Sequence, residues 1–176
     1  MAAAEADTFD YVIVGAGAAG SILAARLTED PETTVCVLEA GPPDTNPFIH
    51  IPAGFIKALV NPDITWQFST EPTENTAGRR VKTVQGRTLG GGSSINGMIY
   101  IRGNKNDDEN WEKLGGKSWC YKDVLPVFKK LENDQTGADP QYHSTDGEWP
   151  VVTPQEVNRT AKRFVKSGAH IGLPHN

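Results

Sequence analysis

Hydrophobic and polar positions in the first forty residues follow two periods in turn. Residues 9–14 (FDYVIV) form a short apolar run closed by Gly15, which predicts a buried strand. Apolar residues then recur at helical spacing over 18–28, and Pro31 ends this predicted helix. Residues 34–38 (TVCVL) predict a second buried strand. A strand, a helix and a strand in close succession form a βαβ unit, which implies a parallel sheet.

The rest of the chain is less regular and predicts shorter elements. Residues 41–85 are rich in proline and predict an ordered excursion. Asn158 can cap a final helix, which Gly172 and Pro174 end. The remaining expected elements are a helix near 55–60, strands at 66–70 and 81–85, helices at 107–114 and 121–131, a strand at 148–152 and a helix at 158–171.

Composition narrows the class of protein. The chain has 176 residues, 38% of them hydrophobic, which suits one globular domain with a sizeable core. The net charge of −5 gives no reason to expect a nucleic-acid partner. Cys36 and Cys120 lack metal-ligand spacing, which argues against a disulfide framework and for a reducing compartment.

No targeting or membrane-spanning segment is expected. No run approaches the ~20 apolar residues that span a bilayer. The N-terminus, MAAAEADTFD, has no basic region followed by an apolar stretch, so a secretory signal is not expected. We therefore expect a cytoplasmic protein, with peripheral membrane association left open.

The first chemical signal is a G-x-G-x-x-G loop between the first predicted strand and helix. Gly15 permits a tight turn, Gly17 leaves space for a pyrophosphate, and Gly20 lets the helix pack on the sheet. The helix N-terminus offers unpaired N–H groups to phosphate. Glu39 ends the second strand, where a carboxylate can accept hydrogen bonds from an adenosine ribose. This unit binds the ADP half that NAD and FAD share, so the loop alone leaves both open.

A second glycine-rich segment, residues 86–100, carries further chemistry. Three consecutive glycines, residues 90–92, allow the backbone to approach a flat ligand closely. Ser93 or Ser94 is expected to cap a helix that has Asn96 in its first turn. A flexible linker fits poorly, because the apolar run INGMIYI follows.

These motifs resemble those of the glucose–methanol–choline (GMC) oxidoreductases. GRTLGGGSSINGMIYIRG followed by N-x5-N-W resembles the family's flavin-contacting signature. The family's sequence is also resembled by the segments DYVIVGAGAAG, VLEAGPPDTNPFIHIPAG and WQFSTEP. Residues 123–126 and the pair His143 and Gly147 fit the family pattern as well. The resemblance is nearest the branch of choline-dehydrogenase-like and acceptor-linked alcohol dehydrogenases.

The resemblance implies FAD as cofactor in an α/β fold, a Rossmann-like βαβ unit with an incomplete parallel sheet plus irregular and helical segments. By the resemblance, the pyrophosphate lies against Gly15, Gly17, Ala18 and Ala19, next to Gly20. The adenosine lies at Glu39 and Ala40. The flavin and its ribityl chain lie along Arg87, Gly91, Gly92, Asn96, Gly97, Met98 and Ile99. Ile95 stands where some relatives carry a histidine joined to the flavin, so no covalent bond is expected there. Gly92, Asp108, Cys120 and Val127 depart from the family pattern.

The resemblance also divides the chain into four segments. We expect an ADP-binding βαβ unit at 1–40, a Pro-rich excursion at 41–85, a flavin-contacting turn and helix at 86–103, and a helical segment at 104–176 that leads into a mostly absent substrate domain. The family's catalytic histidine lies near the end of a longer chain, so no catalytic residue is expected here. His50, His143, His170 and His175 lie outside its motif, and no metal-ligand cluster is predicted.

The leading hypothesis is the FAD-binding part of an alcohol-oxidising flavoenzyme. A base would remove the hydroxyl proton while hydride passes from carbon to flavin N5. Its partners would be a small alcohol, an electron acceptor and the C-terminal remainder of the enzyme. Two alternatives stay open: a hydroxynitrile lyase that binds FAD on the same scaffold, and a non-catalytic flavin- or nucleotide-binding module.

Overall fold

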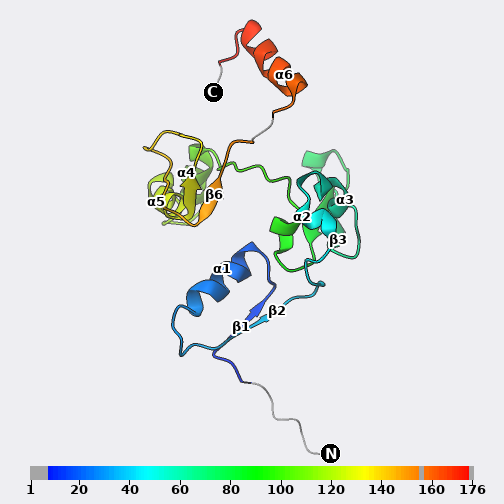
Figure 1. The fold of residues 1–176 in the computed structure, drawn as a ribbon, viewed down its shortest axis with the longest axis vertical. Coiled ribbons are helices and arrows are strands. Elements are labelled where there is room, and N and C mark those ends of the chain that lie inside the picture. The colour runs from blue at the N-terminus through cyan, green and yellow to red at the C-terminus, as the bar shows by residue number, and fades with distance from the viewer. Residues whose placement is uncertain (1–7, 155–156, 175–176) are drawn as a thin grey trace, which may run out of the picture. The chain divides into compact units, whose positions relative to one another are not determined.

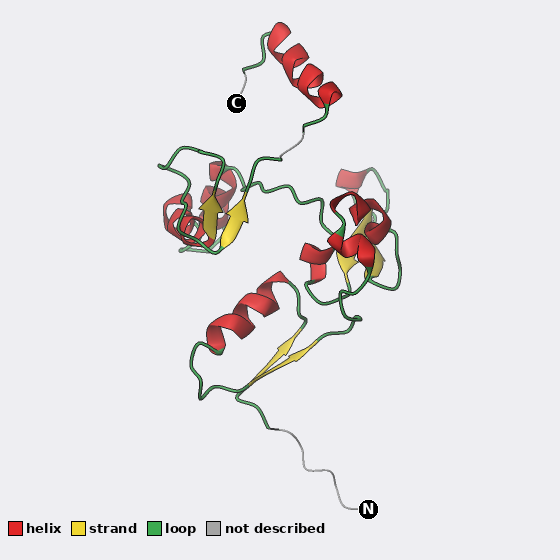
Figure 2. Ribbon diagram, viewed as in Figure 1, coloured by secondary structure: helices red, strands yellow, loops and turns green. Residues whose placement is uncertain are grey.

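The computed structural model describes residues 8–154 and 157–174. The chain forms two compact units, residues 1–99 and 100–176. Figure 1 shows the order of the helices and strands along the chain. Within the described residues, each of the three sheets has two strands (Figure 2). None of the described helices is long and apolar enough to cross a membrane.

The first unit begins with the predicted βαβ unit. Strands β1 (Tyr11–Val14) and β2 (Val35–Leu38) pair in parallel, with Tyr11 opposite Val35 and Val14 opposite Leu38. Helix α1 (Ala18–Leu27) connects them. A local apolar period, a glycine turn and a proline stop are sufficient to specify this unit, and its prediction is confirmed.

The prediction that both strands are buried is wrong for this structure. Val12 is 57% exposed, Val14 84% and Leu38 53%. Helix α1 packs against this sheet near Ile13, but no third strand extends it within residues 8–154 and 157–174. A two-stranded sheet covered on one side leaves the apolar residues of its other side in solvent.

A second layer of short elements completes this unit. Its core is small and consists of Ala58, Ile64 and Ile95. Strands β3 and β4 pair antiparallel, with Trp66 opposite Gln85. The predicted helix near 55–60 and both strands are confirmed, whereas α2 was not predicted. The elements are α2 (Pro47–His50), the 3-10 turn η1 (Pro52–Gly54), α3 (Phe55–Leu59), β3 (Thr65–Ser69), the 3-10 turn η2 (Glu74–Thr76) and β4 (Lys82–Gly86).

The helix expected from Ser93 or Ser94 onward is wrong. The segment forms a 3-10 turn, η3 (Gly91–Ser94), and no helix follows before Lys105. The Ser94 hydroxyl donates to the carbonyl of Leu89 at 2.6 Å instead of capping a helix. Ile95 has a φ of −128° and Met98 a φ of +56°, and both lie outside right-handed helical backbone within the span where the helix was expected.

The second unit contains the later predicted helices. Helices α4 (Lys105–Lys113) and α5 (Tyr121–Leu131) match the predicted spans closely. Strand β5 (Glu132–Asp134) follows α5 directly and pairs in parallel with β6 (Trp149–Val151). Helix α6 (Arg159–His170) begins where Asn158 accepts a hydrogen bond from the Thr160 amide, so the predicted cap is confirmed. The strand β5 was not predicted, because three polar residues carry no strand pattern.

Candidate functional site

A cavity of about 310 Å³ lies in the first unit where the carboxyl ends of β1 and β2 meet the glycine turn. In parallel α/β sheets this edge is the usual place for ligands. The lining comes from both predicted motifs and from the β3–β4 hairpin. The residues are Val14, Gly15, Gly17, Leu38, Glu39, Ala40, Trp66, Gln85, Gly86, Gly91 and Gly92.

The first loop turns sharply at the end of β1. Gly15 has a φ of +98°, and its amide donates to the carbonyl of Leu38 at 2.7 Å. A Cβ atom on Gly20 would overlap the carbonyl oxygen of Gly15 and lie 3.2 Å from a methyl group of Ile13. The loop therefore needs glycine at both positions, one for the turn and one for close packing of α1.

The N-terminus of α1 is open to an anion. Gly17 is the N-cap, and it makes no side-chain hydrogen bond to the first helical amides. No acidic residue lies in the first turn. The amides at this end therefore keep unpaired N–H groups and the positive end of the helix dipole. A phosphate group is the ligand that such an end favours.

Glu39 joins the two strand ends through its carboxylate. Oε2 accepts a hydrogen bond from the Ala16 amide at 2.8 Å, and Oε1 accepts one from the Gly41 amide at 2.9 Å. Each carboxylate oxygen can accept a second hydrogen bond. Glu39 thus shapes the first loop and keeps acceptor capacity for a ligand hydroxyl in the cavity that it lines.

Hydrogen bonds to backbone carbonyls tie the glycine-rich segment to the first loop and to the residues that follow β2. The Gly90 amide donates to the carbonyl of Ala16 at 2.9 Å. The Thr88 hydroxyl donates to the carbonyl of Pro42 at 2.8 Å, and Thr88 is fully buried. Two motifs far apart in the sequence therefore form one continuous backbone surface.

The cavity brings together only part of the predicted set. Gly15, Gly17, Glu39, Ala40, Gly91 and Gly92 line it. The other predicted residues, which are absent from the lining, are Ala18, Ala19, Gly20, Arg87, Asn96, Gly97, Met98 and Ile99.

Five lining residues were not predicted: Val14, Leu38, Trp66, Gln85 and Gly86. Val14 and Leu38 are the last residues of the two parallel strands, a position from which they could have been inferred. Nothing in the local sequence marks Trp66, because strand pairing brings it to the cavity.

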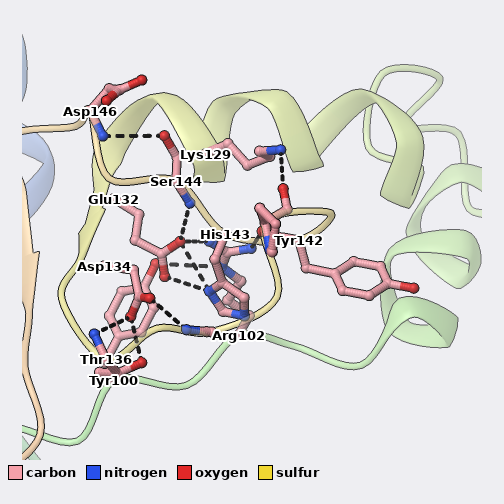
Figure 3. A network of polar contacts seen from close by, with 12 residues as sticks. Tyr100, Arg102, Lys129, Glu132, Asp134, Thr136, Tyr142, His143, Ser144 and Asp146 are labelled. Carbon is pink, nitrogen blue, oxygen red and sulfur yellow. Dashed lines mark hydrogen bonds and ion pairs between the residues drawn. The ribbon is translucent and has the colours of Figure 1, made fainter.

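A separate polar network lies in the second unit around Glu132 (Figure 3). This carboxylate is fully buried and meets Arg102 Nη2 at 2.6 Å and His143 Nδ1 at 2.9 Å. The Ser144 amide also donates to it, at 3.2 Å. Arg102 further donates to the carbonyl of Tyr142 at 2.6 Å. A buried carboxylate with these partners is fully satisfied and joins three segments of the unit.

Asp134, two residues further on, is buried as well. The Thr136 hydroxyl donates to its Oδ1 at 2.7 Å, and the Ala138 amide donates to its Oδ2 at 2.9 Å. The hydrogen bond from the Thr136 hydroxyl, the largest cause, and the backbone amides hold the pKa of Asp134 below its ordinary value of 3.8, although burial acts in the opposite direction.

Neither cysteine and none of the described histidines is among the residues that line the cavity. Cys36 and Cys120 are free thiols. The Cys120 Sγ donates to Asp123 at 3.1 Å, and this hydrogen bond raises the pKa of the thiol. None of His50, His143 and His170 lines the cavity, and His175 lies outside the described residues. Across residues 8–154 and 157–174, no cluster of three His, Cys, Asp or Glu could hold a metal ion.

Comparison with known proteins points to one family. The sequence model described as "GMC oxidoreductase" matches residues 9–176. An alcohol dehydrogenase [acceptor] of Pseudomonas putida is 45% identical over 168 residues, which are 96% of this chain and 30% of that protein. An oxygen-dependent choline dehydrogenase of Sinorhizobium fredii is 42% identical over 164 residues, 93% of this chain and 30% of that protein.

A solved structure agrees with these relatives. The pyridoxine 4-oxidase of Mesorbium loti superposes with a TM-score of 0.81 at 38% identity, over 95% of this chain and 33% of that one. The chain spans about 30% of the length of the curated relatives that it matches. The predicted Rossmann-like α/β fold is confirmed by this likeness.

Proposed function

Because the chain belongs to the GMC oxidoreductase family, whose members are flavin-dependent enzymes acting on CH–OH groups, we propose that it is the FAD-binding part of such an enzyme. The observation that carries the proposal is that the first loop, Glu39 and the glycine turn line the same cavity. The family resemblance implies the same cofactor for both motifs, and a backbone hydrogen bond joins them in the structure.

The residues present fit a dinucleotide. Gly17 and Gly91 leave only backbone at the end of α1, so a pyrophosphate can approach the helix amides closely. A Cβ atom on Gly92 would meet no protein atom within 4 Å, so the backbone there borders open space. Glu39 offers acceptors for ribose hydroxyls beside these glycines.

In this proposal the chain binds and orients the cofactor. The first amides of α1 hold the pyrophosphate, and Glu39 accepts from the adenosine ribose next to Ala40. When bound, FAD supplies an acceptor for the hydride that leaves the substrate carbon. No residue of this chain is assigned to proton removal, because none of its histidines lies in the family's catalytic motif.

The remaining predicted contacts belong to the same proposal. Ala18, Ala19 and Gly20 form the first turn of α1, next to the pyrophosphate position. Asn96, Gly97, Met98 and Ile99 follow the glycine turn and are exposed, so they are free to meet the flavin and its ribityl chain. Ile95 is 4% exposed within the core and has no nucleophilic atom, which supports a non-covalent flavin at this position.

The proposed substrate and electron acceptor are extended from the relatives, whereas the proposed location follows the expectation from the sequence. The substrate is a small-molecule alcohol, and an acceptor takes the electrons, as the names of the alcohol and choline dehydrogenases suggest for those proteins. A C-terminal remainder supplies the base. The protein acts in the cytoplasm, where it makes at most peripheral contact with a membrane.

The absorbance spectrum of the full natural protein tests this function. We expect flavin bands in the purified protein and their bleaching by a primary alcohol without oxygen. Gly17→Val is the matched variant, because its branched side chain would occupy pyrophosphate space. A protein that folds, binds no flavin and shows no bands after addition of FAD would refute the proposal. Equal FAD affinity in Gly17→Val would refute the placement of FAD in this cavity.

A further inference from the structure

Asn96 and Gly97 form a chemically reactive pair in the segment that follows the glycine turn. An asparagine that precedes glycine can close a succinimide ring, because glycine has no side chain to hinder the approach of its amide nitrogen. The sequence holds two pairs that can form such a ring, Asn96–Gly97 and Asp146–Gly147. Both residues of the first pair are exposed and lie outside any helix or strand.

The hydrogen bonds around Asn96 favour ring closure. Its Oδ1 accepts a hydrogen bond from the Met98 amide at 2.9 Å, so the side-chain amide folds back toward the backbone that follows it. A donor on this oxygen stabilises the negative charge that the oxygen gains when its carbon is attacked. Among the residues that the structure describes, no acceptor is found for the Gly97 amide, nor one for Asn96 Nδ2. The attacking nitrogen and the leaving nitrogen are therefore both uncommitted.

The pair Asp146–Gly147 lacks these features. The Gly147 amide donates to the carbonyl of Glu132 at 2.9 Å, so the nitrogen that would attack is already committed. A Cβ atom on Gly147 would overlap the carbonyl group of Leu131, so the backbone is closely packed there. The ionised carboxylate of Asp146 is also a poorer electrophile than an amide. This pair therefore serves as a reference within the same protein.

We propose that Asn96 is a site of spontaneous deamidation in the apoprotein and that the bound cofactor protects it. The Gly97 nitrogen loses its proton and bonds to Cγ of Asn96, and the bond from Cγ to Nδ2 breaks to release ammonia. Water then opens the succinimide at either of its carbonyls and leaves aspartate or isoaspartate at position 96. One water is consumed and one ammonia is released, with no oxidant or reductant. The deamidation is independent of the proposed function, whereas the protection rests on it.

Deamidation would alter the cofactor site. Either product places a negative charge in the segment that the proposed function assigns to the flavin and its ribityl chain. Isoaspartate also adds a methylene group to the backbone. Apoprotein that has deamidated should therefore bind FAD more weakly than fresh apoprotein does.

Peptide mapping by mass spectrometry of the full natural protein tests the site. The apoprotein and the FAD-saturated protein are incubated for days at mildly alkaline pH, and isoaspartate is quantified at positions 96 and 146. We expect it to accumulate at position 96 in the apoprotein, to form much more slowly there with FAD, and to stay undetected at position 146. If Asn96 stays intact in the apoprotein while a synthetic peptide of residues 93–100 deamidates, the proposal is overturned.

Two variants test the route. Gly97→Ala adds a methyl group that hinders the attack, and the fold accommodates it, because the φ of Gly97 is not positive and the added Cβ atom would lie 3.7 Å from the Phe55 ring. Asn96→Gln keeps an amide but would need a larger ring. Both should keep their side-chain amide over the same period, and thermal melts confirm that each apoprotein is folded. Deamidation of Gly97→Ala at the wild-type rate would overturn attack by the Gly97 nitrogen.

The two parts of the proposal fail separately. If the unaltered protein binds no FAD, the proposed function and the protection fail together, and the apoprotein map still decides whether Asn96 deamidates. If the protein binds FAD and Asn96 deamidates equally fast with and without it, only the protection fails.

Discussion

Gly17 and Gly91 lie against each other where the two glycine motifs meet. A Cβ atom on Gly91 would lie 2.7 Å from the Cα of Gly17, a distance that ordinary packing does not allow. A Cβ atom on Gly17 would lie 3.8 Å from the Cα of Gly91, which is ordinary contact. Packing within the protein therefore requires glycine at position 91 but not at position 17, where the proposed function needs the space for a pyrophosphate.

Gly91→Ala should destabilise the protein even without cofactor. The added methyl group would push the turn away from Gly17, and alanine would also have to adopt a φ of +54°. Overpacking of this kind costs about 1–3 kcal/mol. Chemical denaturation of the apoprotein measures it. Gly92→Ala is the control for apoprotein stability, because its Cβ atom would meet nothing within 4 Å and its φ is not positive. Equal losses in both variants would contradict the packing argument.

Glu39→Ala should weaken FAD binding by about 1–3 kcal/mol, the order of one charged hydrogen-bonding group. It removes the acceptors of the Ala16 and Gly41 amides as well as those offered to the ribose. Glu39→Gln keeps one oxygen acceptor, so it should fall between wild type and Glu39→Ala. Isothermal titration of the apoproteins with FAD gives the three affinities. Unchanged binding in both variants would remove Glu39 from the site.

Acid precipitation should release the flavin from the full natural protein. Ile95 has no nucleophile and packs in the core with Ala58 and Ile64, so no bond to flavin can form through its side chain. The measurement is flavin absorbance in the supernatant and the pellet. Flavin that remains in the pellet would show a covalent bond at another residue, contrary to the proposal.

Asp134→Asn should destabilise the protein in a pH-dependent way. The pKa of Asp134 is lowered in the folded state, so its contribution to stability is present above the ordinary pKa of 3.8 and is lost as pH falls through the lower folded value. The melting temperature of the variant should therefore lie below that of wild type near neutral pH, and the difference should shrink in acid. A difference that stays constant from pH about 7 to pH about 3 would show that the hydrogen bonds of Asp134 do not depend on its charge.

Elements that depend on neighbouring residues were predictable from the sequence. Helices α1, α4 and α5 have local periods and clear ends, and Asn158 caps α6 as its residue type favours. The helix expected after Ser93 failed for an equally local reason. Ile95 and Met98 leave helical backbone within the expected span, with φ angles of −128° and +56°, and no residue type in the sequence marks that change.

The sequence by itself determined the βαβ unit, the G-x-G-x-x-G loop with Glu39 and the glycine turn, because each is a short pattern with its own chemistry. Only the tertiary structure decided that Gly91 packs on Gly17, that Trp66 lines the cavity, and that Arg87 makes a cation–π contact with Trp66. The same holds for the network around Glu132. These contacts join residues far apart in the chain, and their free energy comes from packing and desolvation, which no local period encodes.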